Sequence, residues 1–251
     1  MVLTSRTPSD AGAGNHMVNI ELEDQSERLC KLNDWLRLEP GRTAVVTIDM
    51  HRGHLDPVEA TLPVSRETSA RVRAAAGDLL PFLRQRGVPV IHVILTWRPN
   101  EAYKFNPRIE AERFTLSRRA PTTEAQRRGT LHNIAGSIQC ELMPEIGPEP
   151  GDYIINTKKT LSCFLGTDLG LLLGTFLKVD TVLLMGINTN TCVQNAGFEA
   201  MNLGYKVVVI EECVGSMYGE DLHVLGLQNI ARCIGWVLTA DEVKAKLTRD
   251  P

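Results

Sequence analysis

The sequence of 251 residues lacks several features that would assign it to well-known classes of protein. Basic residues are not in excess, because 27 Lys and Arg against 30 Asp and Glu give a formal net charge of −3. The longest apolar runs, such as Thr181–Ile187, fall far short of the roughly 20 residues that are needed to cross a bilayer. We therefore expect no nucleic-acid partner and no membrane partner.

The six cysteines lack the spacing of a zinc site or of a redox pair, because no two of them form a C-x-x-C motif. The segment Met1–Asn15 lacks the apolar centre of a secretion signal. In a chain of this length, both absences favour free thiols in a reducing compartment, and we expect a cytoplasmic protein.

Glycine-rich phosphate loops are absent too. There is no GxxxxGK[ST] motif, and the segment Asp49–Gly53 reads Asp-Met-His-Arg-Gly where a dinucleotide-binding fold would place its glycines. Nucleotide binding is disfavoured, and no cofactor is expected.

From Thr43 onward, short runs rich in Val and Ile alternate with stretches of helix length. This alternation is typical of parallel strands joined by right-handed helical crossovers. We predict an α/β fold with a three-layer α-β-α, Rossmann-like architecture around a six-stranded, mainly parallel sheet. The predicted strands are Thr43–Asp49, Pro89–Leu95, Asp152–Thr157, Thr181–Gly186, Lys206–Glu211 and Gly235–Leu238, and the predicted helices are Ser65–Arg86, Thr167–Phe176, Thr191–Leu203, Glu220–Ala231 and Ala240–Leu247.

Residues 1–40 are interpreted as a tail and a helical arm that precede the α/β domain of residues 41–251. Met1–Asn15 offers little to bury and is expected to be disordered. Ile20–Leu38 has scattered apolar positions, which suit a helix packed on the domain or on a partner subunit. The Arg-rich stretch Arg98–Pro150 is typical of a lid or an oligomer contact.

Reactive side chains follow three of the predicted strands. Asp49 ends the first strand, and Lys158 and Lys159 follow the third. Cys192 lies in the first turn of the helix after the fourth strand. Because ligands of an open parallel sheet bind beyond the carboxyl ends of the strands, these residues are expected to meet there. Taken singly, each has a structural explanation: a capping carboxylate, a solvated lysine pair and a buried thiol.

The three side-chain types have complementary chemistry. A helix N-terminus and a nearby ammonium both favour the thiolate, and a carboxylate can accept the thiol proton and return it to a leaving amine. The polar turn Asn188–Thr191 can supply backbone N–H groups to an oxyanion. The pattern indicates nucleophilic catalysis by cysteine.

Over nearly all of Thr43–Val243, the chain resembles the isochorismatase-like cysteine hydrolase superfamily. The resemblance rests on the strand-end Asp49, on Lys158 six residues before Phe164, and on the cysteine-bearing segment Gly186–Val193. Members include N-carbamoylsarcosine amidohydrolase, biuret hydrolase, ureidoacrylate amidohydrolase and nicotinamidase.

The resemblance implies a role for each residue. Cys192 would be the nucleophile, Asp49 the general base and Lys158 the polarising cation, with Lys159 a bystander. The backbone N–H groups of Asn188 and Cys192 would form the oxyanion hole.

The resemblance also implies a cis peptide bond at Ile187–Asn188 and a homo-oligomer, a dimer or tetramer, in which we expect the arm to pack across a subunit boundary. Trp97 and Phe164 are expected, from their positions, to line the substrate pocket, although either could belong to the core.

The implied activity is hydrolysis of a C–N bond in a small amide, carbamoyl or ureido compound through an acyl-thioester, with release of ammonia or an amine. Isochorismatases cleave a vinyl ether and lack the catalytic cysteine, so Cys192 argues against that reaction. Nicotinamidases have a metal site built partly from a Trp-His pair after the second strand. Here Arg98 follows Trp97, so we assign no metal and expect hydrolysis to survive chelation.

Two alternatives stay open. The run Asp49-x-His51-x-x-His54, or His92, could bind a metal and give a metal-assisted amidase of the nicotinamidase type. The chain could also be a non-catalytic binding member of the fold, which labelling with a thiol alkylator would distinguish.

Overall fold

The computed structural model describes residues 2–4, 19–102, 104 and 120–248. Its centre is a six-stranded sheet with the order β5-β4-β3-β6-β7-β8, in which every neighbouring pair is parallel. The predicted fold class is confirmed, and the sheet is wholly rather than mainly parallel. The strands are β3 (Thr43–Ile48), β4 (Val90–Leu95), β5 (Tyr153–Lys158), β6 (Thr181–Ile187), β7 (Lys206–Gly215) and β8 (Trp236–Leu238).

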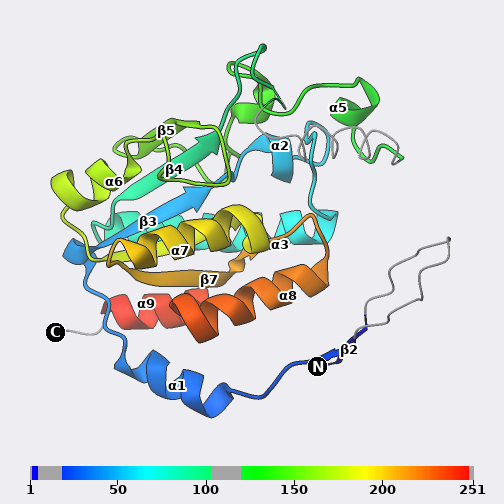
Figure 1. The fold of residues 1–251 in the computed structure, drawn as a ribbon. Helices are drawn as coiled ribbons and strands as arrows, with labels where there is room; N and C mark the ends of the chain where they lie inside the picture. The colour runs from blue at the N-terminus through cyan, green and yellow to red at the C-terminus, as the bar shows by residue number, and fades with distance from the viewer. Residues whose placement is uncertain (1, 5–18, 103, 105–119, 249–251) are drawn as a thin grey trace.

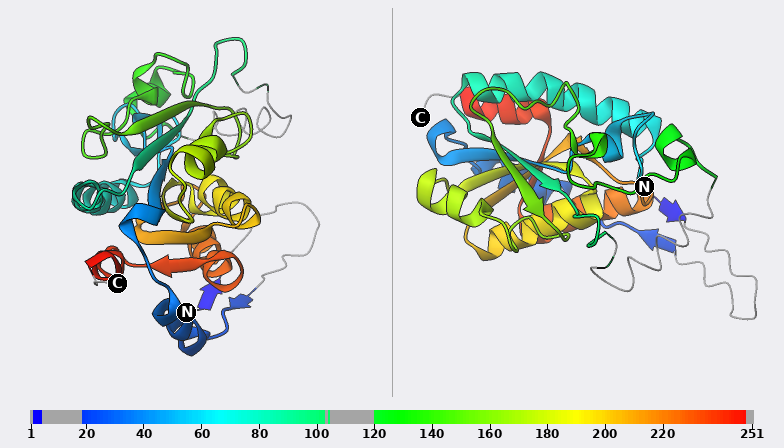
Figure 2. Two further views of the ribbon diagram at one scale, coloured as in Figure 1. Left: turned by 90° about the vertical axis from the view of Figure 1, so that its left-hand side faces the viewer. Right: turned by 90° about the horizontal axis from the view of Figure 1, so that it is seen from above.

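Helices cover both faces of the sheet, which gives the three predicted layers (Figure 1, Figure 2). One face is covered by α3 (Arg66–Gln85) and α9 (Ala240–Thr248), and the other by α6 (Leu169–Leu171), α7 (Gln194–Asn202) and α8 (Glu220–Asn229). Shorter helical segments are α1 (Ser26–Trp35), α2 (Arg52–Leu55), α5 (Glu124–Arg127), the 3₁₀ turns Pro40–Arg42 and Ile138–Cys140, and the π-helical turns Leu172–Phe176, Thr189–Val193 and Ile230–Ile234.

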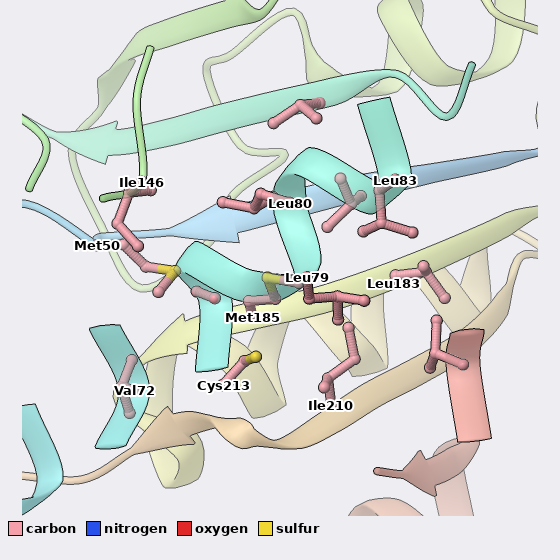
Figure 3. Close-up of a cluster of buried hydrophobic side chains, with 14 of the residues drawn as sticks. Met50, Val72, Leu79, Leu80, Leu83, Ile146, Leu183, Met185, Ile210 and Cys213 are labelled. Carbon is pink, nitrogen blue, oxygen red and sulfur yellow. The ribbon is translucent and has the colours of Figure 1, made fainter. Parts of the chain in front are cut away.

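Local sequence explains the main helix of the first face. The Ser65 side chain caps α3 by accepting a hydrogen bond from the backbone N–H of Thr68 (3.0 Å). Apolar residues at helical spacing, including Leu79 and Leu83, are buried against Leu183 and its neighbours in a cluster that Figure 3 shows in close-up.

Two of the predicted helices are less regular than expected. The segment predicted as Thr167–Phe176 is a single α-helical turn followed by the π-helical turn Leu172–Phe176. The helix predicted to begin at Thr191 is preceded by the π-helical turn Thr189–Val193, which contains Cys192. Sequence periodicity does not separate π from α turns, because both bury the same face of a short apolar segment.

The N-terminal region differs from the prediction in two ways. The strand β1 (Val2–Thr4) pairs antiparallel with β2 (Asn19–Glu21), so the expectation of disorder is wrong for Val2–Thr4. The other residues of the tail, 1 and 5–18, lie outside the described residues. The arm helix α1 contacts its own chain, where Trp35 stacks on Trp236 of β8 at 6.4 Å between ring centroids. Its packing across a subunit boundary stays a prediction.

The carboxyl ends of β3, β4 and β6 meet at one edge of the sheet, near α2 (Figure 1). The described part of the insertion returns to this edge, where Trp97 bridges Ile134 and His51 bridges Leu142. Within the described ranges, no helix has both the length and the apolar character that crossing a membrane requires.

Candidate active site

The structure brings together the three residues that the sequence placed at strand ends. The Nζ of Lys158 donates a hydrogen bond to Oδ2 of Asp49 (2.6 Å) and lies 3.4 Å from Sγ of Cys192. Lys158 ends β5, Asp49 follows β3, and Cys192 follows β6. All three are buried, with exposed fractions of 0%, 1% and 6% respectively.

The backbone of Asp49 and both oxygens of its carboxylate are held in place by their surroundings. Its backbone adopts the left-handed conformation (φ 52°), which turns the chain sharply as it leaves β3. Oδ1 accepts a hydrogen bond from the backbone N–H of Leu95 (2.8 Å), while Oδ2 accepts from Lys158. The contact with Leu95 comes from backbone, and no sequence signal indicates it.

The turn that carries Cys192 approaches Asp49 because of Gly186. At this glycine φ is +135°, and a Cβ atom would collide with the backbone of Ile48, so only glycine lets β6 come this close to the end of β3. The next peptide bond, Ile187–Asn188, is cis, as the resemblance implied. The side-chain Oδ1 of Asn188 accepts from the backbone N–H of Met217 (2.8 Å), which anchors the turn to the segment after β7.

Burial and charge act in opposite directions on the thiol of Cys192. Burial raises the pKa of the Cys192 thiol to about 11, although the Lys158 ammonium works in the opposite direction. For Lys158, burial works to lower the pKa, but Asp49 and Cys192 outweigh it, so the pKa lies above its ordinary value. At neutral pH the site therefore contains a neutral thiol beside a charged lysine.

Lys159 lies outside this group, as predicted. Its Nζ donates to the backbone carbonyl of Thr96 (2.6 Å) and lies 3.6 Å from Oε2 of Glu101. Successive residues of an extended strand point to opposite faces, which separates the two neighbouring lysines.

Trp97 and Phe164 are placed by contacts with other elements. Trp97 is buried, and its backbone pairs with Asn133 and Ala135 of the insertion (2.8 Å each). Phe164 is half-buried and packs against the core on the α6 side of the sheet. Their contact with a substrate stays a prediction.

The histidines form a group that sequence reasoning found only in part. His51 and His54 lie with His132, and one ring nitrogen from each lies within 4.8 Å of the others. His132 comes from the insertion, and no spacing in the sequence connects it to the other two. His92 does not join them, because it bonds to Thr47 (2.7 Å) and Asp152 (3.0 Å) on β3 and before β5.

Comparison with known proteins gives one family. The isochorismatase domain model matches residues 43–242. A maleamate amidohydrolase from Pseudomonas putida is 28% identical over 206 residues, 82% of this chain and 87% of the relative. A ureidoacrylate amidohydrolase from Pseudomonas syringae pv. syringae is 27% identical over 221 residues, 82% of this chain and 84% of the relative.

Two solved structures share the fold. A cysteine hydrolase from Pseudomonas syringae pv. phaseolicola superposes with a TM-score of 0.70 at 24% identity, covering 84% of this chain and 94% of its own. An N-carbamoylsarcosine amidase from Thermoplasma acidophilum gives a TM-score of 0.61 at 23% identity, with coverages of 80% and 97%.

Proposed function

We propose that this chain, which belongs to the isochorismatase family, is a cysteine-dependent amidohydrolase of small amide, carbamoyl or ureido compounds. The reaction class, hydrolysis of a C–N bond other than a peptide bond, follows the amidohydrolases that match most of its length. The observation that carries the cysteine mechanism is the buried contact of Lys158 with both Asp49 and Cys192.

The first half-reaction forms the acyl-enzyme. Asp49 takes the thiol proton, which is needed because the buried thiol of Cys192 is protonated at neutral pH. The thiolate attacks the substrate carbonyl, and the backbone N–H groups of Asn188 and Cys192 donate to the oxyanion. Collapse of the tetrahedral intermediate breaks the C–N bond, and the carboxylic acid of Asp49 protonates the leaving amine or ammonia.

The second half-reaction reverses these roles with water. The carboxylate of Asp49 takes a proton from water, whose oxygen attacks the thioester carbon. The C–S bond breaks, the thiolate regains its proton from Asp49, and the acid product leaves. Lys158 stabilises the negative charge as it moves between the carboxylate, the sulfur and the oxyanion. Because the ammonium is buried, where the dielectric constant is low, its attraction for these negative charges is strong.

The substrate class is tested by a panel of maleamate, ureidoacrylate, N-carbamoylsarcosine, biuret and nicotinamide, with ammonia release as the readout. We expect release from at least one compound, and rapid mixing with the best one should trap a mass increase on the peptide that contains Cys192. Ammonia release without any acyl adduct, and undiminished by Cys192→Ser, would contradict the proposal. Turnover confined to nicotinamide and dependent on an added divalent metal would favour the metal-assisted alternative.

We further propose that the enzyme is a homo-oligomer that works in the cytoplasm. Large apolar side chains stay exposed between β5 and β6, including Leu165 (67%), Leu171 (54%) and Phe176 (69%), and a second subunit would cover them. All six cysteines are free, which suits a reducing compartment.

Light scattering of the full chain at micromolar concentration should give a multiple of 27.8 kDa. Phe176→Glu should lower that mass, because it places a charge in the apolar contact. A monomeric mass for the wild-type chain would overturn the proposed assembly.

A further inference from the structure

A compact group of three histidines lies beside the triad, and the proposed hydrolysis does not use it. His51, His54 and His132 are buried, with exposed fractions of 0%, 7% and 5%. Their ring centroids are 4.9 to 5.7 Å apart, and one nitrogen from each ring lies within 4.8 Å of the others. Burial lowers the pKa of all three, which disfavours the charged imidazolium form. Nε2 of His51 accepts a hydrogen bond from Nδ2 of Asn133 (2.7 Å), so an ion would bind this ring through Nδ1 or replace the amide at Nε2.

Neighbouring groups orient two of the rings from outside the cluster. Nδ1 of His54 bonds to the carbonyl of Leu62 (2.6 Å), and Nδ1 of His132 bonds to the hydroxyl of Thr61 (2.7 Å). Because the Leu62 carbonyl can only accept, the His54 ring donates through Nδ1 and has its lone pair on Nε2. This is the arrangement by which proteins fix a metal-binding imidazole. The Thr61 hydroxyl can donate or accept, so it positions the His132 ring without fixing its tautomer.

Two buried polar atoms at the cluster make no hydrogen bond within the described residues, namely Nδ1 of His51 and Oδ1 of Asn133. Both residues have an exposed fraction of 0%. A Cβ atom added to Gly53 would collide with Oδ1 of Asn133 and lie 2.9 Å from Nδ1 of His51. The two atoms without a hydrogen bond therefore both lie next to Gly53. A buried polar atom without a partner costs about 1–3 kcal/mol, which a bound ligand can relieve.

We propose that His51, His54 and His132 bind one divalent transition-metal ion of the zinc class. Three neutral imidazoles suit this class, whereas Mg²⁺ and Ca²⁺ prefer oxygen ligands. Zn–N bonds of about 2.0–2.1 Å place tetrahedral ligand nitrogens roughly 3.4 Å apart. Each nitrogen of the cluster therefore has to move by less than about 1 Å.

The charges around the cluster are mixed. Oδ1 of Asp49 lies 3.9 Å from Nε2 of His51 and favours a cation there, whereas the ammonium of Lys158 opposes it. Because the ion pair of Asp49 with Lys158 balances those two charges, the imidazoles are the groups that would hold the ion.

The proposed ion would join two segments that are distant in sequence. His51 directly precedes α2 and His54 lies within it, shortly after Asp49. His132 belongs to the insertion before Asn133. The metal would fasten the described part of the insertion over the triad without entering the thiol chemistry, so the proposal stands whether or not the hydrolysis is correct.

The test uses tag-free full-length protein, stripped with a chelator and titrated with Co²⁺ and Zn²⁺. We expect about one Co²⁺ per chain in equilibrium dialysis, a visible absorption band of low-coordinate Co²⁺, and loss of that band on adding Zn²⁺. Zn²⁺ should also raise the Tm, because it binds the folded state. X-ray absorption at the zinc edge should count three imidazole ligands. Absence of Co²⁺ binding, or a zinc shell containing sulfur, would overturn the proposal.

Variants locate the site. His54→Gln and His132→Gln should each weaken Co²⁺ binding by at least about tenfold, whereas His223→Gln should not. His223 is the matched control because it is also buried and bonds through Nδ1 to a hydroxyl, that of Thr189 (2.8 Å). Wild-type affinity in either cluster variant, or an equal loss in His223→Gln, would contradict the assignment. If a cluster variant does not fold, the ligand count on the wild-type protein decides.

Discussion

Replacing Cys192 by alanine is expected to abolish turnover on every substrate found, with a loss on the order of 10⁴-fold or more. No other described group of the site can form the acyl-enzyme, because Asp49 is held by Leu95 and Lys158 and the lysine is charged. The measurement is kcat/KM from ammonia release. The fold should persist, because removal of one small buried thiol costs only about 1 kcal/mol.

The matched control for Cys192 is Cys163. It is also buried, and the charge of Lys158 acts on its thiol, while burial raises its pKa well above the ordinary value. Cys163→Ala should keep turnover within about tenfold of the wild type, and Cys140→Ser at a half-buried position of the insertion should do the same. Retention of activity in Cys192→Ala would refute the proposed nucleophile. A larger loss in Cys163→Ala than in Cys192→Ala would move the nucleophile to the other thiol.

Replacing Lys158 by methionine is expected to reduce turnover on the order of 10²-fold or more. It should also slow alkylation of Cys192. The wild-type thiol has a pKa of about 11, with the Lys158 ammonium acting to lower it, so removal of the ammonium shifts the thiolate form to still higher pH. Iodoacetamide rates measured against pH on the Cys192 peptide should rise toward pH 11 in the wild type and later in the variant. An unchanged alkylation profile with full activity would exclude Lys158 from catalysis.

Lys159→Met is the control for this substitution, since Lys159 bonds to Thr96 and lies outside the site. We expect it to change neither turnover nor the alkylation profile. Equal effects from the two substitutions would contradict the assignment of Lys158 rather than Lys159.

Stability has to be separated from chemistry in the Lys158 variant. Removal of one partner of a buried ion pair costs about 3–5 kcal/mol, because the other charge stays buried and unpaired. The double variant Asp49→Asn/Lys158→Met removes both charges and should regain much of the lost Tm while staying inactive. Recovery of activity together with stability would show that the pair has only a structural role.

The sequence by itself determined the architecture and the grouping of Asp49, Lys158 and Cys192. Runs such as Ala44–Ile48 are mainly apolar because a central parallel strand is buried on both faces. Their alternation with helices fixes the crossovers. Asp49, Lys158 and Cys192 were predictable because parallel strands bring their carboxyl ends to one edge. The sequence marks where each strand ends.

Only the tertiary structure decided the state of these groups and their neighbours. The sequence indicated groups that lower the pKa of the Cys192 thiol, but the opposing and larger effect of burial, which raises that pKa to about 11, depends on the folded chain. The contact of the arm with β8, made by the stacking of Trp35 on Trp236, joins segments that are far apart in the sequence. His132 joined His51 and His54 through an irregular insertion, where no periodicity relates sequence to position. Regular elements repeat a geometry that sequence patterns record, whereas contacts made by loops and burial of single groups depend on the whole folded chain.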